Sequence, residues 1–168
     1  MDRGFAQHLR HIKKKIGEGA YAAGVYRFTL EDVVTGKKTI KYYHNVLTMD
    51  FFTMIMNNLT DPTPDNDMLF NYVALGDDDT LVTENDSVLG NEVYRNVTGS
   101  KTSAANIAYV VGFFTQTEVT GTFKEAGVVC DGTASADTGI LASHVNIDIT
   151  KTNVQKLTID WMMTLLNA

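Results

Sequence analysis

KLTIDWMMTL, at residues 156–165, shows the clearest alternation of side-chain types in the 168-residue chain. Its odd positions share one face and are all apolar: Leu157, Ile159, Trp161, Met163 and Leu165. Its even positions are mostly polar. Because successive side chains of a strand point to opposite faces, this period of two predicts a strand with one face in a core.

Short runs rich in β-branched and aromatic residues occur along most of the rest of the chain, separated by turn residues. We expect strands at 20–30, 39–44, 71–75, 91–97, 105–115, 121–130 and 139–149. Thr35 and Gly36 lie between the first two runs and predict a hairpin turn. The run 105–115 is apolar on both faces, which is typical of a central strand.

One internal helix is expected from Met49 to Leu59. Thr48 can cap its first turn, and Asp50 lies near its positive end. The predicted core stripe of this helix is Phe52, Ile55, Met56 and Leu59. One helix among about eight strands predicts a mainly β chain, folded as an antiparallel β-sandwich with jelly-roll-like winding.

The first sixteen residues predict a second, amphipathic helix. Its apolar positions are Phe5, Leu9, Ile12 and Ile16, at spacings of four, three and four. Gly17 and Gly19 then form a hinge. A helix with one apolar face is not stable alone, so we expect it to dock on its own domain or on another subunit. We therefore divide the chain into a docking arm, residues 1–18, and one β-sandwich domain, residues 19–168.

Charge is distributed unevenly along the chain. Residues 1–44 carry nine Lys or Arg side chains and four acids, a balance of +5, whereas residues 45–168 have a balance of -11. The arm contributes Lys13, Lys14 and Lys15. Its partner could be nucleic acid or the acidic body of a neighbouring copy, or the charged face could simply be solvated and have no partner. We favour the neighbouring copy, because the chain already encodes it, and consider nucleic acid unfavoured.

Composition excludes several classes of protein. The hydrophobic share of 44% and the charged share of 20% are ordinary for a globular domain. A single cysteine, Cys130, excludes a disulfide framework and a cysteine-based zinc site. The sequence has no run of about 20 apolar residues and no secretion signal. We expect a soluble protein, made in a reducing compartment, that does not contact a membrane.

The sequence shows no arrangement typical of an active site. The four histidines are His8, His11, His44 and His144; no Gly-x-Ser-x-Gly turn accompanies them, and Cys130 has no histidine nearby in the sequence. No nucleotide-binding glycine motif is present. We therefore assign no catalytic residue, expect no cofactor, and predict that the protein is not an enzyme.

Two acidic clusters are the candidates for a metal site. They are Asp61, Asp65 and Asp67 in one loop, and Asp77, Asp78 and Asp79 in another. Carboxylate oxygens suit calcium, but neither cluster has the glycine and terminal glutamate of a helix–loop–helix calcium site. Solvated acidic loops are the main interpretation, and a calcium site shared by the two clusters is the alternative.

Two further features have competing interpretations. Strand aromatics such as Tyr26, Phe28 and Phe113 could line a sugar-binding face, although core packing is more usual. Glu125 lies in an apolar run and would be buried in a central strand. It would then need a partner, either Arg95 or a set of backbone amides.

Six short strings, taken in order, resemble the virion structural proteins of tailed bacteriophages. They are similar to a β-sandwich domain of phage tail-fibre and tail-associated proteins. The strings are Tyr72-Val73-Ala74-Leu75-Gly76 before a polar loop, Leu89-Gly90-Asn91-Glu92 with Tyr94-Arg95, GTFKEAGV at 121–128, GILA at 139–142, ITKT at 149–152 and LTIDW at 157–161. Together they cover about 100 residues.

The resemblance implies a structural role in which Glu92, Arg95 and Glu125 hold the fold. The chain departs from the pattern at Asp77–Asp79, where small residues are usual, and in the arm. We expect a non-enzymatic subunit of the tail or fibre-attachment apparatus, assembled through the arm as a homo-oligomer with other virion proteins. It would be made in the host bacterial cytoplasm and reside in the virion. A capsid decoration protein and a glycan-binding module for host attachment are the alternatives.

Overall fold

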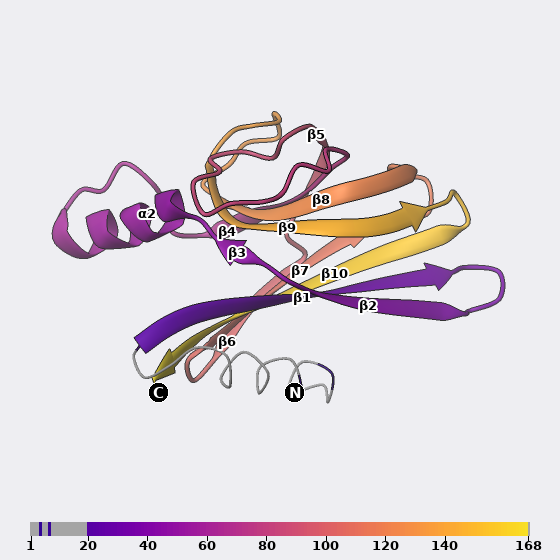
Figure 1. Ribbon diagram of the computed structural model, residues 1–168, viewed down its shortest axis with the longest axis horizontal. Coiled ribbons are helices and arrows are strands. Elements are labelled where there is room, and N and C mark those ends of the chain that lie inside the picture. The colour runs from indigo at the N-terminus through magenta and orange to yellow at the C-terminus, as the bar shows by residue number, and fades with distance from the viewer. Residues whose placement is uncertain (1–3, 5–6, 8–19, 168) are drawn as a thin grey trace.

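The computed structural model describes residues 4, 7 and 20–167 of the chain (Figure 1). The arm residues Phe5, Leu9, Ile12, Lys13, Lys14, Lys15 and Ile16 lie outside the described residues. The described elements, in chain order, are β1 (Ala20–Asp32), β2 (Lys38–His44), β3 (Val46–Leu47), α2 (Met49–Thr60), β4 (Phe70–Gly76), β5 (Glu92–Val97), β6 (Ser100–Ala104), β7 (Ile107–Phe114), β8 (Gly121–Cys130), β9 (Ile140–Lys151) and β10 (Gln155–Asn167).

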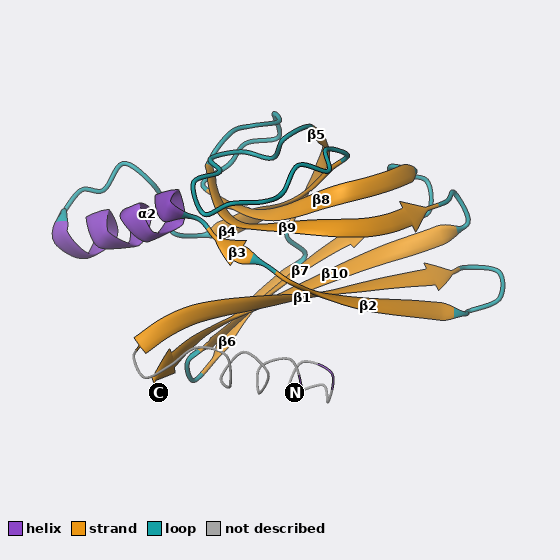
Figure 2. Ribbon diagram, viewed as in Figure 1, coloured by secondary structure: helices purple, strands orange, loops and turns teal. Residues whose placement is uncertain are grey.

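The strands form two five-stranded sheets in which all neighbours are antiparallel (Figure 2). Sheet A has the order β2-β1-β10-β7-β6, and sheet B has the order β3-β9-β8-β4-β5. The predicted mainly β class, the two antiparallel sheets and the internal helix are confirmed. The architecture is consistent with a β-sandwich.

The two sheets share one apolar core. Sheet A contributes residues such as Phe28 and Trp161, and sheet B contributes residues such as Val73 and Val145, all at most 1% exposed. Tyr26 on β1 also links the sheets, because its hydroxyl lies 2.8 Å from Oγ of Ser143 on β9. The strand that the sequence shows most clearly, β10, lies at the centre of sheet A, where alternate residues enter this core.

The predicted hairpin is present, with β1 paired to β2 and Gly36 at a positive φ of 69° in the turn. The run 105–115 needs a correction. Its strand is β7, which is interior to sheet A, but Ala105 belongs to the turn after the unpredicted β6, and Phe113 is 40% exposed. Only one face of β7 therefore packs in the core.

The outer face of sheet A, away from sheet B, carries a smaller apolar cluster. Val25 and Met162 are fully buried there, beside half-buried residues of the flanking strands that include Tyr42. Gly4 lies so close to the Tyr42 ring that no space remains for a Cβ at this position. Part of the outer face of sheet A is therefore apolar and covered.

α2 begins where predicted, with Oγ1 of Thr48 accepting a hydrogen bond from the Phe51 amide at 3.3 Å. The predicted core stripe is wrong at two of its four positions, because Phe52 and Ile55 pack against the core but Met56 and Leu59 do not. Phe51 and Met54, each 2% exposed, are the residues that pack on Cys130 and Ala142 at the end of sheet B. Met56 and Leu59 are exposed, and Phe52 and Ile55 are half-buried. The helix is apolar around more than half of its circumference, so its periodicity does not choose the side that faces the sheet.

Candidate functional site

The loop of residues 77–91 connects β4 to β5 and lies over the outer face of sheet B, away from sheet A (Figure 1). Leu89 is its buried apolar anchor, 3% exposed, and packs with Ala74, Val129 and Leu141 of the sheet below. A single anchor is little apolar burial for a fifteen-residue loop. The loop is therefore held mainly by its polar contacts with the sheet below.

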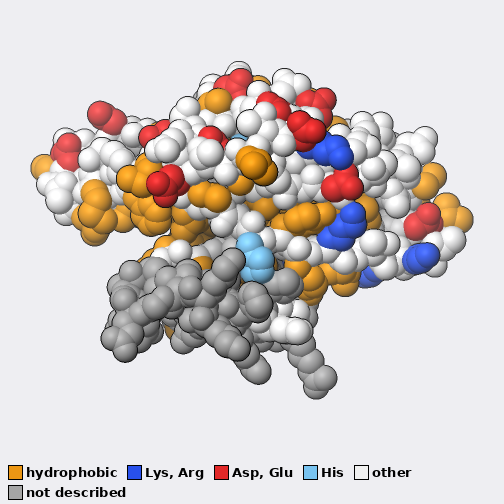
Figure 3. Space-filling view, viewed as in Figure 1, with side chains coloured by type: hydrophobic (Ala, Val, Ile, Leu, Met, Phe, Trp, Pro, Cys, Tyr) orange, Lys and Arg blue, Asp and Glu red, His pale blue; other side chains and the backbone are white. Residues whose placement is uncertain are grey.

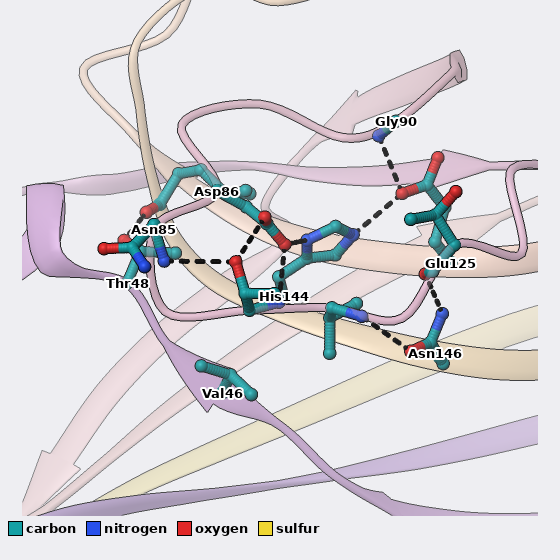
Figure 4. Close-up of polar contacts among 12 residues, drawn as sticks. Val46, Thr48, Asn85, Asp86, Gly90, Glu125, His144 and Asn146 are labelled. Carbon is teal, nitrogen blue, oxygen red and sulfur yellow. Dashed lines mark hydrogen bonds and ion pairs between the residues drawn. The ribbon is translucent and has the colours of Figure 1, made fainter.

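His144 on β9 lies between two carboxylates beneath this loop (Figure 4). Its Nδ1 is 2.8 Å from Oδ2 of Asp86 in the loop, and its Nε2 is 2.7 Å from Oε2 of Glu125 on β8. The His144 and Glu125 side chains are 5% and 2% exposed. Both belong to the outer face of sheet B, and Asp86 approaches them from above.

Both carboxylates are held in the charged form. Burial would raise the pKa of Glu125, but hydrogen bonds from His144 and from the amides of Asn91 and Gly90 outweigh it and lower that pKa. Burial would also raise the pKa of Asp86. Hydrogen bonds from Thr83 and His144 outweigh this effect, so the pKa of Asp86 is lowered as well. Two ionised carboxylates are acceptors only. The His144 ring therefore bridges the two carboxylates, with one ring nitrogen in contact with each.

Glu125 also fixes the second end of the loop. Its two carboxylate oxygens accept from the amides of Gly90, at 2.9 Å, and Asn91, at 2.8 Å. The carboxylate lies against Gly76 at the end of β4, where a Cβ would collide with it. Gly76 is thus needed because of this close approach, and the second end of the loop is held by one buried acid.

The first half of the loop is held by an amide side chain. Asn146 on β9 accepts from the Val82 amide at 2.9 Å and donates to the Thr80 carbonyl at 2.8 Å. The loop then continues to α2, because the Met49 amide donates to the Glu84 carbonyl at 2.7 Å. Loop 77–91 is therefore tied to β8, β9 and the first turn of α2.

A cleft of about 360 Å³ opens beside this network, lined by residues of the loop together with Glu125 and His144. Both ring nitrogens of His144 are engaged by carboxylates of the same chain. The arrangement acts as a charged clamp. It ties loop 77–91 to β8 and β9 through the contacts of Asp86, His144 and Glu125.

A buried ion pair between Glu92 and Arg95 holds the loop that connects β8 to β9. Glu92 and Arg95, both on β5, have side chains that are 2% and 5% exposed. Arg95 donates from Nε and, at 2.6 Å, from Nη2 to the Glu92 carboxylate. Its Nη1 donates to the carbonyls of Thr133 and Thr138, each at 3.0 Å. Arg95 therefore pins the loop between β8 and β9.

The three polar residues named from the resemblance are thus distributed over two networks. Glu125 is buried, and backbone amides are among its partners, which is one of the two options considered. Arg95 is not its partner, because the guanidinium is taken by Glu92, three residues away on the same strand. His144 was assigned no role from the sequence. The pairing of Gly127 with His144 in the β8–β9 ladder places it diagonally beside Glu125.

The two acidic clusters are not brought together. Asp61, Asp65 and Asp67 precede β4, and Asp77–Asp79 follow it, so a seven-residue strand of roughly 20 Å separates them. Asp61 and Asp78 accept hydrogen bonds from nearby threonine amides, those of Thr63 and Thr80. Among the residues that the structure describes, no group of three or more His, Cys, Asp or Glu side chains could hold a metal ion.

Of the strand aromatics considered for a sugar-binding face, three are in the core, and Tyr42 and Tyr43 are half-buried. Tyr26, Phe28 and Phe114 are at most 1% exposed, and Phe113 is the one with a clearly exposed ring among those with described side chains. Within the described part of the chain, no helix is long and apolar enough to cross a membrane. Comparisons with models of protein families, with curated proteins and with solved structures gave no match.

Proposed function

We propose that the chain is a non-enzymatic structural subunit of a tailed-phage virion, in the tail or the fibre-attachment apparatus. It forms a jelly-roll-like sandwich that assembles as a homo-oligomer through the arm, after synthesis in the host cytoplasm. The proposal starts from the resemblance in residues 72–161 and from the division of charge along the chain.

One observation supports the structural role more than any other. The polar residues of the pattern, Glu92, Arg95 and Glu125, have their buried charges fully engaged by loops of the same chain. None of the buried side-chain nitrogen or oxygen atoms among the described residues lacks a hydrogen-bond partner. A site that binds or transforms a ligand keeps some polar groups available to it. Here the polar groups on the outer face of sheet B are used to hold two long loops.

Loops fixed in this manner suit a subunit that must present a constant surface to its neighbours. A loop that is already ordered loses little conformational entropy when a neighbouring subunit packs on it. Buried charge pairs contribute little net stability, so their use here is better explained by the defined loop conformation that they impose.

The test is to locate the chain in purified particles. Virions from the source culture are banded by density, and their peptides are identified by mass spectrometry. Antibodies against the chain are then imaged on the particles by immunogold electron microscopy. We expect peptides of this chain in the particle band and gold at the tail. Gold on the capsid would favour decoration instead, and absence from pure particles would overturn the virion assignment.

Glycan binding is tested on the same protein. A glycan array probed with the full-length chain is expected to show no specific binding, because most of the described strand aromatics are buried or half-buried. Specific, saturable binding to one glycan class would overturn the purely structural role. A mutation of Phe113, the exposed strand aromatic, would then be the first variant to measure.

A further inference from the structure

α2 has a second apolar stripe, of which its own domain covers only Phe52, a half-buried residue packed against the core. Met49, Met56 and Leu59 are 48%, 54% and 72% exposed, and Phe52 lies half-buried between them. These residues are spaced three, four and three apart, which places them along one side of the helix. In Figure 3 hydrophobic side chains gather on the surface at the end of the molecule where α2 lies. We refer to these four residues as the α2 stripe.

The surroundings of the α2 stripe are acidic. Asp50 lies in the first turn of α2, and Asp61, Asp65 and Asp67 follow its last turn, all of them exposed. Residues 42–94 contain no Lys or Arg and ten acidic residues. Two α2 helices packed antiparallel would place Asp50 of one copy near Asp61 of the other. This like-charge contact disfavours pairing of the stripe with itself and favours a basic apolar partner.

The arm has the matching pattern. Phe5, Leu9, Ile12 and Ile16 are spaced four, three and four apart, with Arg10 and Lys13–Lys15 between and beside them. Alternating spacings of three and four on two helices are the pattern of a left-handed helix pair, in which the side chains of each fit between those of the other. The arm sequence therefore predicts an apolar stripe flanked by basic residues, and the structure shows an apolar stripe on α2 flanked by acidic residues.

We propose that the α2 stripe is the docking surface for the arm of a neighbouring copy. The inference rests on the proposed function, because it names the surface through which the subunits would assemble. In the single chain Gly4 lies against Tyr42 of its own β2 and the stripe stays exposed, so the stripe is open to the arm of a neighbour. The contact at Tyr42 opens when the arm moves to the next copy.

Charge also separates the two surfaces available to the arm. On sheet A, where Gly4 lies, Arg27 and Lys38 are paired with Asp160 and Glu31, so the charges there are largely balanced and attract the lysines of the arm little. The region of α2 attracts them, and the attraction increases the rate of association at low salt. The apolar seam then supplies most of the affinity, since exposed ion pairs contribute little.

The test is a disulfide cross-link between copies of the full-length chain that carry different single substitutions. The native Cys130 is fully buried, and burial raises the pKa of its thiol to about 12, so it does not compete in mild oxidation. Chains with Leu9→Cys are mixed with chains with Leu59→Cys and oxidised, and the product is resolved on a non-reducing gel. The matched control replaces Leu59→Cys with Leu81→Cys, a leucine that is 82% exposed in loop 77–91.

We expect the Leu9→Cys and Leu59→Cys chains to form a covalent heterodimer at least tenfold more efficiently than the control pair. Equal cross-linking of both pairs, or none with Leu59→Cys, would overturn the docking surface. Light scattering of the unoxidised mixture separates this failure from that of the proposed function. A defined oligomer without the Leu59→Cys cross-link refutes the α2 stripe alone, whereas a monomer at every concentration also removes support for self-assembly.

Discussion

Loop 77–91 and α2 are joined by the hydrogen bond from the Met49 amide to the Glu84 carbonyl, yet they are stabilised in opposite ways. The loop has one buried apolar anchor and is held by buried charges, with no buried polar side chain left unpaired among the described residues. α2 is held by two buried apolar residues, Phe51 and Met54, and leaves three others, Met49, Met56 and Leu59, exposed. The buried polar groups beneath the loop are already bonded within the chain, whereas α2 has exposed apolar surface to which a partner could bind.

The largest effect is expected where a buried charge loses its partner. Arg95→Ala leaves the Glu92 carboxylate buried without its guanidinium and frees the loop between β8 and β9. Breaking a buried pair in this manner costs about 3–5 kcal/mol. The free energy of unfolding is measured by urea denaturation at pH 7.

The control for Arg95 is Lys38→Ala, which removes an ion pair with Glu31 whose side chains are 56% and 37% exposed. Exposed pairs contribute about 0–1 kcal/mol, so this variant should unfold close to the wild-type midpoint. Similar losses for the two variants would contradict the view that buried charges hold the loops.

The next effect concerns the clamp itself. His144→Ala removes the ring that lies between the Asp86 and Glu125 carboxylates, and we expect a loss of about 1–3 kcal/mol in the free energy of unfolding. Hydrogen exchange should also accelerate at the amides of loop 77–91, because Asp86 no longer ties the loop to β9. Asp79→Asn, an exposed change in the same loop, is the control and should have neither effect.

β10, the Thr48 cap and the contacts of His144 show which features the sequence could predict and which it could not. β10 was predicted because apolar and mostly polar side chains alternate along it. The Thr48 cap was predicted because capping depends only on residues close in sequence. The proximity of His144 to Glu125 depends on the β8–β9 register, which includes bulges near Phe123 and Val128. No local pattern encodes such a register. The clamp therefore could not be found from spacing alone.

A smaller effect is the dependence of stability on pH. The pKa values of Glu125 and Asp86 are lowered in the folded state from their ordinary values of 4.5 and 3.8. Groups with a depressed folded pKa bind fewer protons than in the unfolded chain, so their contribution is complete above the ordinary values and is lost as pH falls through the lowered ones.

Urea midpoints of the wild type should therefore decrease as the pH falls from 6 to below about 4. Glu125→Gln cannot ionise and should show a shallower decrease, from a lower starting midpoint at pH 6. Parallel curves for the two proteins would show that Glu125 does not contribute to the acid sensitivity.

The smallest effect on stability is expected on the exposed side of α2, and it tests the other half of the comparison. Leu59→Ser removes apolar surface that is 72% exposed, so the free energy of unfolding should change by no more than about 0.5 kcal/mol. If the α2 stripe is the docking surface, the same change should weaken self-association at least tenfold in sedimentation equilibrium, because it places a polar group in the helix seam. Leu81→Ser, at 82% exposed, should alter neither quantity. Loss of stability without loss of association would mean that α2 serves its own fold, as the loop does.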